Sequence, residues 1–308
     1  MNAEAKLRPL RGIIPPMATP LASVDSLDIP GLEKLIEHIL SGGVHALFIL
    51  GTTGEGPALS YKLRRELIER VCRQVGTRVP VLVGITDTAY TECLHMAEAA
   101  ARAGAAAVVA APPYYFQFGQ SDILRLIESL ASESALPLYL YNQPELTKIS
   151  FSPATVARAA EIPNVWGLKD SSGEIGYIKQ ALALIGNKPE FSVLVGPEHL
   201  LAEALECGAH GGVPGGANIF PTLPVRLYQA FLDGKENEMQ ELQAKMVEIG
   251  SPIWNSGENE SGYLRRLKCA LSVLGLCSGL PTWPYQQSTP EEQQQIEDHL
   301  RQHGIFPA

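Results

Sequence analysis

Short apolar runs alternate with amphipathic stretches along the first two thirds of the chain. The apolar runs have the length and composition of buried strands, and apolar positions in the stretches between them recur with helical spacing. The predicted strands cover residues 12–16, 44–50, 79–85, 106–111, 137–142, 165–169, 191–195 and 211–214. The predicted helices cover residues 29–40, 63–75, 91–103, 121–133, 153–160, 175–185 and 199–206. This alternation is typical of an α/β fold with a parallel sheet.

Eight strand-plus-helix units predict a (β/α)8 TIM barrel. An open, doubly wound sheet is the alternative, but no Gly-x-Gly-x-x-Gly run follows the first predicted strand. After residue 220 the strand-like runs stop, and the pattern predicts helices over residues 223–232, 236–249, 262–274 and 291–303. We therefore expect a barrel over residues 1–220 and a C-terminal helical appendage, packed on that barrel, over residues 221–308.

Composition narrows the class of partner. The chain has 308 residues, of which 45% are hydrophobic and 19% charged, so it can bury a large core and is too apolar to be disordered. Its net charge of −9 argues against nucleic acid or an anionic membrane surface and favours a small-molecule substrate. The most apolar stretch, residues 99–111, is interrupted by charge and glycine and is too short to span a bilayer.

Cysteine and histidine spacing bears on location and metal binding. The five cysteines include no Cys-x-x-Cys pair, and the first residues lack the apolar core of a signal peptide, so we expect a cytoplasmic protein with reduced thiols. The seven histidines show none of the close groupings of a metal site. We expect neither a metal ion nor another cofactor.

The most informative segment runs from Val165 to Gly173, where an apolar strand ends in Lys169 and a polar turn follows. Apolar surroundings favour the neutral amine of a lysine, which is the form that attacks a carbonyl carbon. A lysine at the end of a strand can also simply extend to solvent. The other strand ends help to decide, because the carboxyl ends of barrel strands together form the active site.

Those strand ends carry hydroxyl groups, phenols and a glycine turn. The second predicted strand runs into residues 51–55, a glycine-flanked threonine pair whose hydroxyls and backbone N–H groups suit a carboxylate. The fourth is followed by Tyr115, and the fifth ends at Tyr141. Tyr141 is a candidate for moving protons at a carbinolamine, with Thr52 passing the proton onward.

Together these motifs resemble those of the dihydrodipicolinate synthase and N-acetylneuraminate lyase family of pyruvate-dependent Schiff-base enzymes. The resemblance covers nearly the whole chain and rests on Gly51-Thr52-Thr53-Gly54-Glu55, Tyr141-Asn142-Gln143-Pro144 and Gly167-Leu168-Lys169-Asp170. It implies that Lys169 forms an imine with the keto carbon of pyruvate, or of a 2-oxo acid that releases pyruvate. The imine then accepts electrons while a C–C bond forms or breaks.

The resemblance also implies how protons move. Tyr141 would be the acid and base at the imine, and it would be linked through Thr52 to Tyr115. In this family the tyrosine at the position of Tyr115 comes from a neighbouring subunit. The expected assembly is therefore a homotetramer, a dimer of dimers, in which Tyr115 reaches a neighbouring active site.

The remaining roles implied by the resemblance concern binding. Thr53, with the backbone around Gly51, would hold the carboxylate of pyruvate. Val213 would line the pocket beside the lysine. Glu55 is expected to brace the turn rather than contact the substrate.

One position departs from the family pattern. In the dihydrodipicolinate synthases an arginine two residues after the Tyr-Asn-x-Pro motif grips the carboxylate of the aldehyde partner, and this chain has Leu146 there. Losing a charge-assisted contact worth roughly 1.5–3 kcal/mol predicts poor binding of an acidic semialdehyde. Lys148 lacks the planar fork of arginine. Residues 86–88 suit a hydroxylated partner, or they cap the next helix instead.

The predicted reaction is therefore the making or breaking of a C–C bond in a 2-oxo acid of the keto-deoxy sugar acid or 4-hydroxy-2-oxo acid type. Three alternatives stay open. The first is a 4-hydroxy-tetrahydrodipicolinate synthase that condenses pyruvate with aspartate semialdehyde. The second is a barrel that binds phosphate through the glycine-rich residues 211–216, and the third is a pyruvate-binding protein without turnover. A proton relay argues against the last, because binding alone does not need one.

Overall fold

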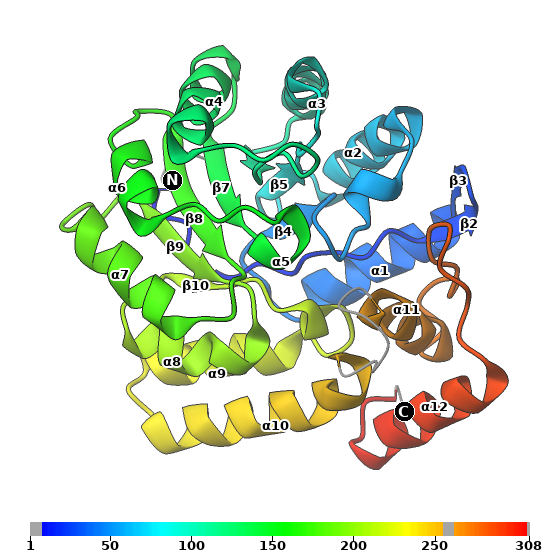
Figure 1. Ribbon diagram of the computed structural model, residues 1–308. Helices are drawn as coiled ribbons and strands as arrows, with labels where there is room; N and C mark the ends of the chain where they lie inside the picture. The colour runs from blue at the N-terminus through cyan, green and yellow to red at the C-terminus, as the bar shows by residue number, and fades with distance from the viewer. Residues whose placement is uncertain (1–7, 255–261, 307–308) are drawn as a thin grey trace.

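The computed structural model describes residues 8–254 and 262–306. Its centre is a parallel sheet of eight strands in the spatial order β1-β10-β9-β8-β7-β6-β5-β4 (Figure 1). The strands are β1 (Gly12–Ile13), β4 (Leu47–Ile49), β5 (Val81–Gly84), β6 (Ala107–Ala110), β7 (Leu138–Asn142), β8 (Val165–Asp170), β9 (Ser192–Val195) and β10 (Gly211–Gly212). Phe48 N donates to Pro15 O at 2.9 Å, and Met17 N donates to Phe48 O at 2.8 Å. These bonds join the two ends of the sheet, so the predicted (β/α)8 barrel is confirmed.

A ring of helices surrounds the barrel, and neighbours in the ring follow one another along the chain (Figure 1). Its members are α1 (Ile29–Ser41), α2 (Tyr61–Val75), α3 (Tyr90–Ala103), α4 (Gln120–Glu133), α6 (Pro153–Ala159), α7 (Ile175–Ile185), α8 (Leu201–Glu206) and α9 (Thr222–Leu232). Each helix buries its apolar stripe against the strands, as the helical spacing of its apolar residues requires. The helices predicted before residue 220 are all present, with bounds shifted by a few residues.

Alternate residues of each strand face two different cores. On β7, Leu138 and Leu140 pack in the larger core between strands and helices, whereas Tyr139 and Tyr141 belong to the smaller core inside the barrel. Strand register places Tyr141 beside Lys169 of β8. The pleat therefore directs both functional candidates toward the barrel axis.

Three short elements were not predicted from the sequence. Strands β2 (Leu21–Ser23) and β3 (Ser26–Leu27) form an antiparallel hairpin, and α5 (Pro144–Thr147) follows β7 at once. The hairpin strands carry no apolar run like those of the barrel strands, and the single turn of α5 is too short to show helical spacing. The position of α5 matters, because it lies at the end of the barrel where the functional candidates gather.

Three further helices follow the ring: α10 (Glu236–Trp254), α11 (Tyr263–Val273) and α12 (Pro290–Gln302). They pack on one another, and α10 also packs along α9 (Figure 1). The C-terminal helices are confirmed, and the boundary at residue 220 stays a prediction. Among the described helices, none combines the length and the apolar character needed to cross a membrane.

A buried ion pair anchors these helices to the loop that follows β4. Lys268 Nζ of α11 lies 2.5 Å from Glu55 Oε1, and neither side chain is more than 2% exposed. Glu55 Oε2 accepts hydrogen bonds from the N–H and the hydroxyl of Thr282, each at 2.7 Å. Burial lowers the pKa of Lys268, and the facing Glu55 carboxylate opposes that shift. Glu55 thus braces the turn, as expected from the sequence.

Removing one partner of this pair should be costly. In Lys268→Met the Glu55 carboxylate stays buried without its cation, so we expect the free energy of unfolding to fall by about 3–5 kcal/mol, measured by urea denaturation. Lys179→Met is the matched control, because Lys179 pairs with Glu203 at the surface, so its removal should lower the free energy of unfolding far less. Glu55→Gln combined with Lys268→Met should recover part of the loss. Equal effects of the two lysine substitutions would contradict this role.

Candidate active site

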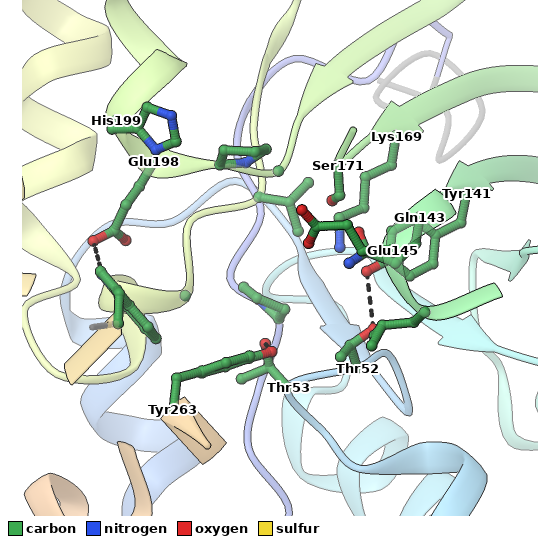
Figure 2. Close-up of a pocket in the computed structure, with 17 residues that line it drawn as sticks. Thr52, Thr53, Tyr141, Gln143, Glu145, Lys169, Ser171, Glu198, His199 and Tyr263 are labelled. Atoms are coloured by element: carbon green, nitrogen blue, oxygen red, sulfur yellow. Dashed lines mark hydrogen bonds between the residues drawn. The ribbon is translucent and has the colours of Figure 1, made fainter. Parts of the chain in front are cut away.

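A cavity of about 310 Å³ opens at the carboxyl ends of the barrel strands (Figure 2). Its wall comes from the ends of β4, β7, β8, β9 and β10, from α5, and from α10 and α11 of the C-terminal part. Five of the residues singled out from the sequence line it, namely Lys169, Tyr141, Thr52, Thr53 and Val213. Most of the candidates taken from the strand ends therefore lie together in this cavity.

Lys169 is held against aromatic rings. Its side chain is buried, with 6% of the residue exposed, and its Nζ lies 3.9 Å from the centroid of the Tyr141 ring and 5.1 Å from that of Phe48. Within residues 8–254 and 262–306, no carboxylate lies within ion-pair distance of this amine. An amine so placed can reach a carbonyl carbon in the cavity without first leaving a counter-ion.

Tyr141 and Thr52 form a hydrogen-bonded pair of hydroxyl groups. Their hydroxyl groups lie 3.0 Å apart, across the cavity side of β7 and the loop after β4 (Figure 2). Phe48 packs edge-on against the Tyr141 ring, with centroids 6.3 Å apart, and fixes the direction of the phenol. A hydroxyl pair at this distance can pass a proton between its members.

The loop that carries the two threonines is tightly constrained. Leu50 and Glu55, at its two ends, adopt left-handed backbone conformations with φ of 59° and 54°. A Cβ at Gly51 would lie 2.5 Å from the Phe48 ring, so glycine is required there. Strained backbone of this kind persists only where surrounding contacts hold it in place. Here the ion pair of Glu55 with Lys268 and its hydrogen bonds from Thr282 do so.

Two predicted residues do not line this cavity. Gly51 lines an adjoining, smaller cavity of about 230 Å³ that also touches Thr52 and Tyr141. Tyr115 is 79% exposed and packs edge-on against Phe116, with ring centroids 5.1 Å apart. A single chain therefore does not bring Tyr115 to Thr52.

The ends of β7 and β8 are locked together behind the cavity. Asn142 Nδ2 donates to Asp170 Oδ1 at 2.7 Å, and the Ser172 hydroxyl donates to Asp170 Oδ2 at 2.8 Å. Burial raises the pKa of Asp170, and the hydrogen bonds from Asn142 and Ser172 oppose that shift. This network holds the two strands in the register that sets Tyr141 beside Lys169.

The opposite wall contains a buried carboxylate. Glu198 accepts hydrogen bonds from Gly216 N at 2.8 Å and from Trp254 Nε1 at 2.5 Å. Burial raises the pKa of Glu198 to about 7. Cβ atoms at Gly215 and Gly216 would collide with Trp254 and Phe220 respectively. The glycine-rich residues 211–216 thus pack against the protein's own side chains, which argues against an open phosphate site.

A family model described as the dihydrodipicolinate synthetase family matches residues 9–303. The chain belongs to the dihydrodipicolinate synthetase family. The resemblance identified from the three sequence motifs is therefore confirmed, and the chain is an enzyme of the lyase type found in this family.

Solved structures and curated relatives of this family are similar over almost their full length. The dihydrodipicolinate synthase of Bacteroides thetaiotaomicron is 48% identical, with a TM-score of 0.92 and coverage of 98% of this chain and 100% of that one. The prophage protein YagE of E. coli K12, solved in complex with pyruvate, is 28% identical, with a TM-score of 0.91 and coverage of 96% and 99%. The 4-hydroxy-tetrahydrodipicolinate synthase of Neisseria meningitidis serogroup C (strain 053442) is 32% identical, with coverage of 96% and 99%.

At the position where the resemblance places the arginine of dihydrodipicolinate synthases, this family member has an apolar wall. Leu146 lines the cavity. The Lys148 ammonium donates to the backbone carbonyl of Glu145, in its own short helix, and Lys148 does not line the cavity. Lys148 therefore does not replace the arginine.

Residues 86–88 brace the barrel instead of lining the large cavity. The Thr86 hydroxyl accepts a hydrogen bond from Ala111 N at 2.9 Å. Asp87 Oδ1 accepts one from Ala89 N at 3.0 Å, and Asp87 Oδ2 pairs with buried Arg64 at 3.1 Å. Thr86 also lines the adjoining smaller cavity, and α3 begins after Ala89 without a side-chain cap, so both interpretations of this segment stay open.

Several cavity residues of this family member were missed from the sequence. They are Gln143, Glu145, Ser171, Glu198, Trp254 and Tyr263. Reading the end of every strand would have found Ser171 after β8 and Glu198 after β9. Trp254 and Tyr263 come from helices, where no strand end marks them. Across the described residues, no three His, Cys, Asp or Glu side chains are grouped in a way that would hold a metal ion.

Proposed function

We propose that the chain is a pyruvate-dependent Schiff-base aldolase that cleaves or forms a C–C bond in a keto-deoxy sugar acid or 4-hydroxy-2-oxo acid. The observation that carries this proposal is the buried amine of Lys169 beside the Tyr141–Thr52 hydroxyl pair. The pyruvate complex of the related YagE supports pyruvate as the common reactant.

Lys169 supplies the covalent chemistry. Its Nζ attacks the keto carbon of the 2-oxo acid, and the carbinolamine loses water to give a protonated imine. In cleavage, Tyr141 removes the proton of the C4 hydroxyl group, and the C3–C4 electron pair moves toward the imine nitrogen. An aldehyde leaves, and the remaining enamine is protonated at C3 and hydrolysed to pyruvate. Formation of the bond is the same sequence in reverse.

Thr53 and the backbone around Gly51 would hold the carboxylate next to the reacting carbon. The Thr53 hydroxyl lies 3.5 Å from the Tyr263 hydroxyl, so α11 supports it from the far side. Burial raises the pKa of Tyr263, so this phenol stays neutral and can donate a hydrogen bond to an oxygen atom. Val213 would close the pocket beside the lysine.

A panel of 2-oxo acids tests the substrate class, with pyruvate release as the readout. We expect keto-deoxy sugar acids and 4-hydroxy-2-oxo acids to release pyruvate in a Lys169-dependent manner. If aspartate semialdehyde and pyruvate condense far faster than any of these acids is cleaved, the chain is a synthase instead. We expect cleavage of these acids because Leu146 stands where dihydrodipicolinate synthases have a carboxylate-binding arginine.

We further propose a homotetramer in which Tyr115 completes the proton path of a neighbouring site. Tyr115 and Phe116 are 79% and 68% exposed, an aromatic surface suited to burial against a second copy. All five cysteines are free thiols, which fits the proposed cytoplasmic location.

Mixed oligomers test the shared site. Tyr115→Phe alone and Lys169→Ala alone should each be nearly inactive. Co-refolded together, they should regain roughly a quarter of the parental activity, because random pairing of subunits leaves one intact site in half of the dimers. Mixtures no more active than the separate variants would contradict the proposed exchange of Tyr115.

A further inference from the structure

We propose that Glu145 is a specificity-determining residue, which binds hydroxyl groups on the aldehyde-derived part of the substrate and repels a second carboxylate there. This inference rests on the proposed Schiff-base function and narrows its substrate class. The favoured substrate is a 2-oxo acid with one carboxylate and an uncharged, hydroxylated tail. Dicarboxylic 2-oxo acids are disfavoured.

The charges around the cavity carry the first step. Glu145 lies on α5, and its carboxylate points into the cavity on the side of Lys169 and Ser171 (Figure 2). Among the described residues that line the cavity, Lys169 is the one lysine or arginine. Its charge is committed to the imine. The other basic side chain of the described lining, His199, lies beside Glu198 on the wall opposite Glu145 (Figure 2). A carboxylate on the substrate tail near Glu145 would therefore meet a like charge.

Two further charged side chains near this end of the barrel, Lys148 and Glu198, already have partners within the protein. Lys148, the nearest lysine in sequence, donates to the Glu145 carbonyl and does not line the cavity. Glu198, the second carboxylate of the wall, already accepts the Gly216 and Trp254 N–H groups. Glu145 is thus left as the carboxylate available to the substrate.

An orphaned acceptor gives the second, independent observation. Gln143 lies two residues before Glu145 and lines the same cavity, and its buried Oε1 has no hydrogen-bond partner among the residues that the structure describes. Buried polar atoms are normally paired, so this oxygen calls for a donor from a ligand. Hydroxyl groups donate, whereas carboxylates only accept. Gln143 and Glu145 together present acceptors that suit a polyhydroxylated tail.

Specificity of this kind combines an attractive and a repulsive element. The acceptors of Gln143 and Glu145 favour hydroxyl groups, and the negative charge of Glu145 opposes a second carboxylate. Because Glu145 lies at the exposed rim, salt should weaken the repulsion but leave the hydrogen bonds in place.

The test compares two probes that differ in the tail, 2-keto-3-deoxygluconate and 4-hydroxy-2-oxoglutarate. We expect the parent to prefer the first, by kcat/KM, on the order of 100-fold, and Glu145→Gln to reduce that preference at least about 10-fold, mainly through a lower KM for the dicarboxylate. Glu145→Ala should act in the same direction. High salt should reduce the preference of the parent and not that of Glu145→Gln.

Glu174→Gln is the matched control, because Glu174 is exposed just beyond β8 and does not line the cavity. An unchanged preference in Glu145→Gln, or an equal change in Glu174→Gln, would overturn the role of Glu145. Trapping of pyruvate with borohydride separates this outcome from failure of the proposed function. A parent chain that forms no pyruvate adduct would refute the Schiff-base chemistry itself.

Discussion

Lys169→Ala is expected to lose the pyruvate adduct that borohydride traps on the parent chain, and to lose activity by a factor on the order of 10⁴ or more. The covalent bond can form only at an amine that reaches the keto carbon, and Lys169 supplies the amine of the cavity. Intact-protein mass spectrometry after reduction measures the adduct directly. Pyruvate release measures the loss of turnover.

Lys148→Ala is the control for this experiment. Lys148 directly follows the short helix α5 and lies outside the cavity lining, so its removal should leave the adduct and its yield unchanged. Because Lys169 fills space between Phe48 and Tyr141, Lys169→Met tests whether the loss follows the amine or the packing. An adduct that persists in both Lys169 variants would refute the proposed mechanism.

Tyr141→Phe is expected to reduce kcat by about 10²–10⁴-fold while changing the KM for the 2-oxo acid much less. The substitution removes the hydroxyl that lies 3.0 Å from Thr52 and keeps the ring that packs against Lys169 and Phe48. The substrate should still bind, but proton transfer at C4 and at the carbinolamine should become slow. Steady-state kinetics separates the two parameters.

Tyr139→Phe is the matched control, since Tyr139 lies on the same strand, faces the same barrel interior and is buried below the cavity. It removes a phenol hydroxyl without touching the proposed proton path. We expect at most a small change in kcat. A comparable fall in kcat in both variants would show that Tyr141 acts through packing rather than through its hydroxyl group.

The hydrophobic pattern predicted the barrel well, because apolar runs at the strand positions alternate along the chain with stretches of helical spacing. Residues 138–141 show why a strand is a continuous apolar run. Leu138 and Leu140 pack in the outer core, and Tyr139 and Tyr141 pack in the inner one, so both faces of the strand are buried. The hairpin of β2 and β3 and the single turn of α5 escaped notice. These elements depend on a few residues at local turns, which give no repeating pattern in the sequence.

The site was predicted in part. Lys169, Tyr141 and the threonine pair are found at strand ends, which share one edge of the barrel. Trp254 and Tyr263 enter the cavity from C-terminal helices, and only tertiary packing determines that placement. Gln143 lies inside a recognised motif and Glu145 directly after it, yet their importance depends on which partners surround them. Sequence spacing does not give that information.

The anchoring of the C-terminal helices has a consequence for biosynthesis. Lys268 holds the loop of Glu55, and Tyr263 reaches Thr53, so residues more than two hundred positions apart complete the cavity. Contacts of such long sequence separation form late in folding. A nascent chain still attached to the ribosome carries Lys169 long before α11 has been made. The cavity is therefore complete only after α11 has been synthesised and has packed against the barrel.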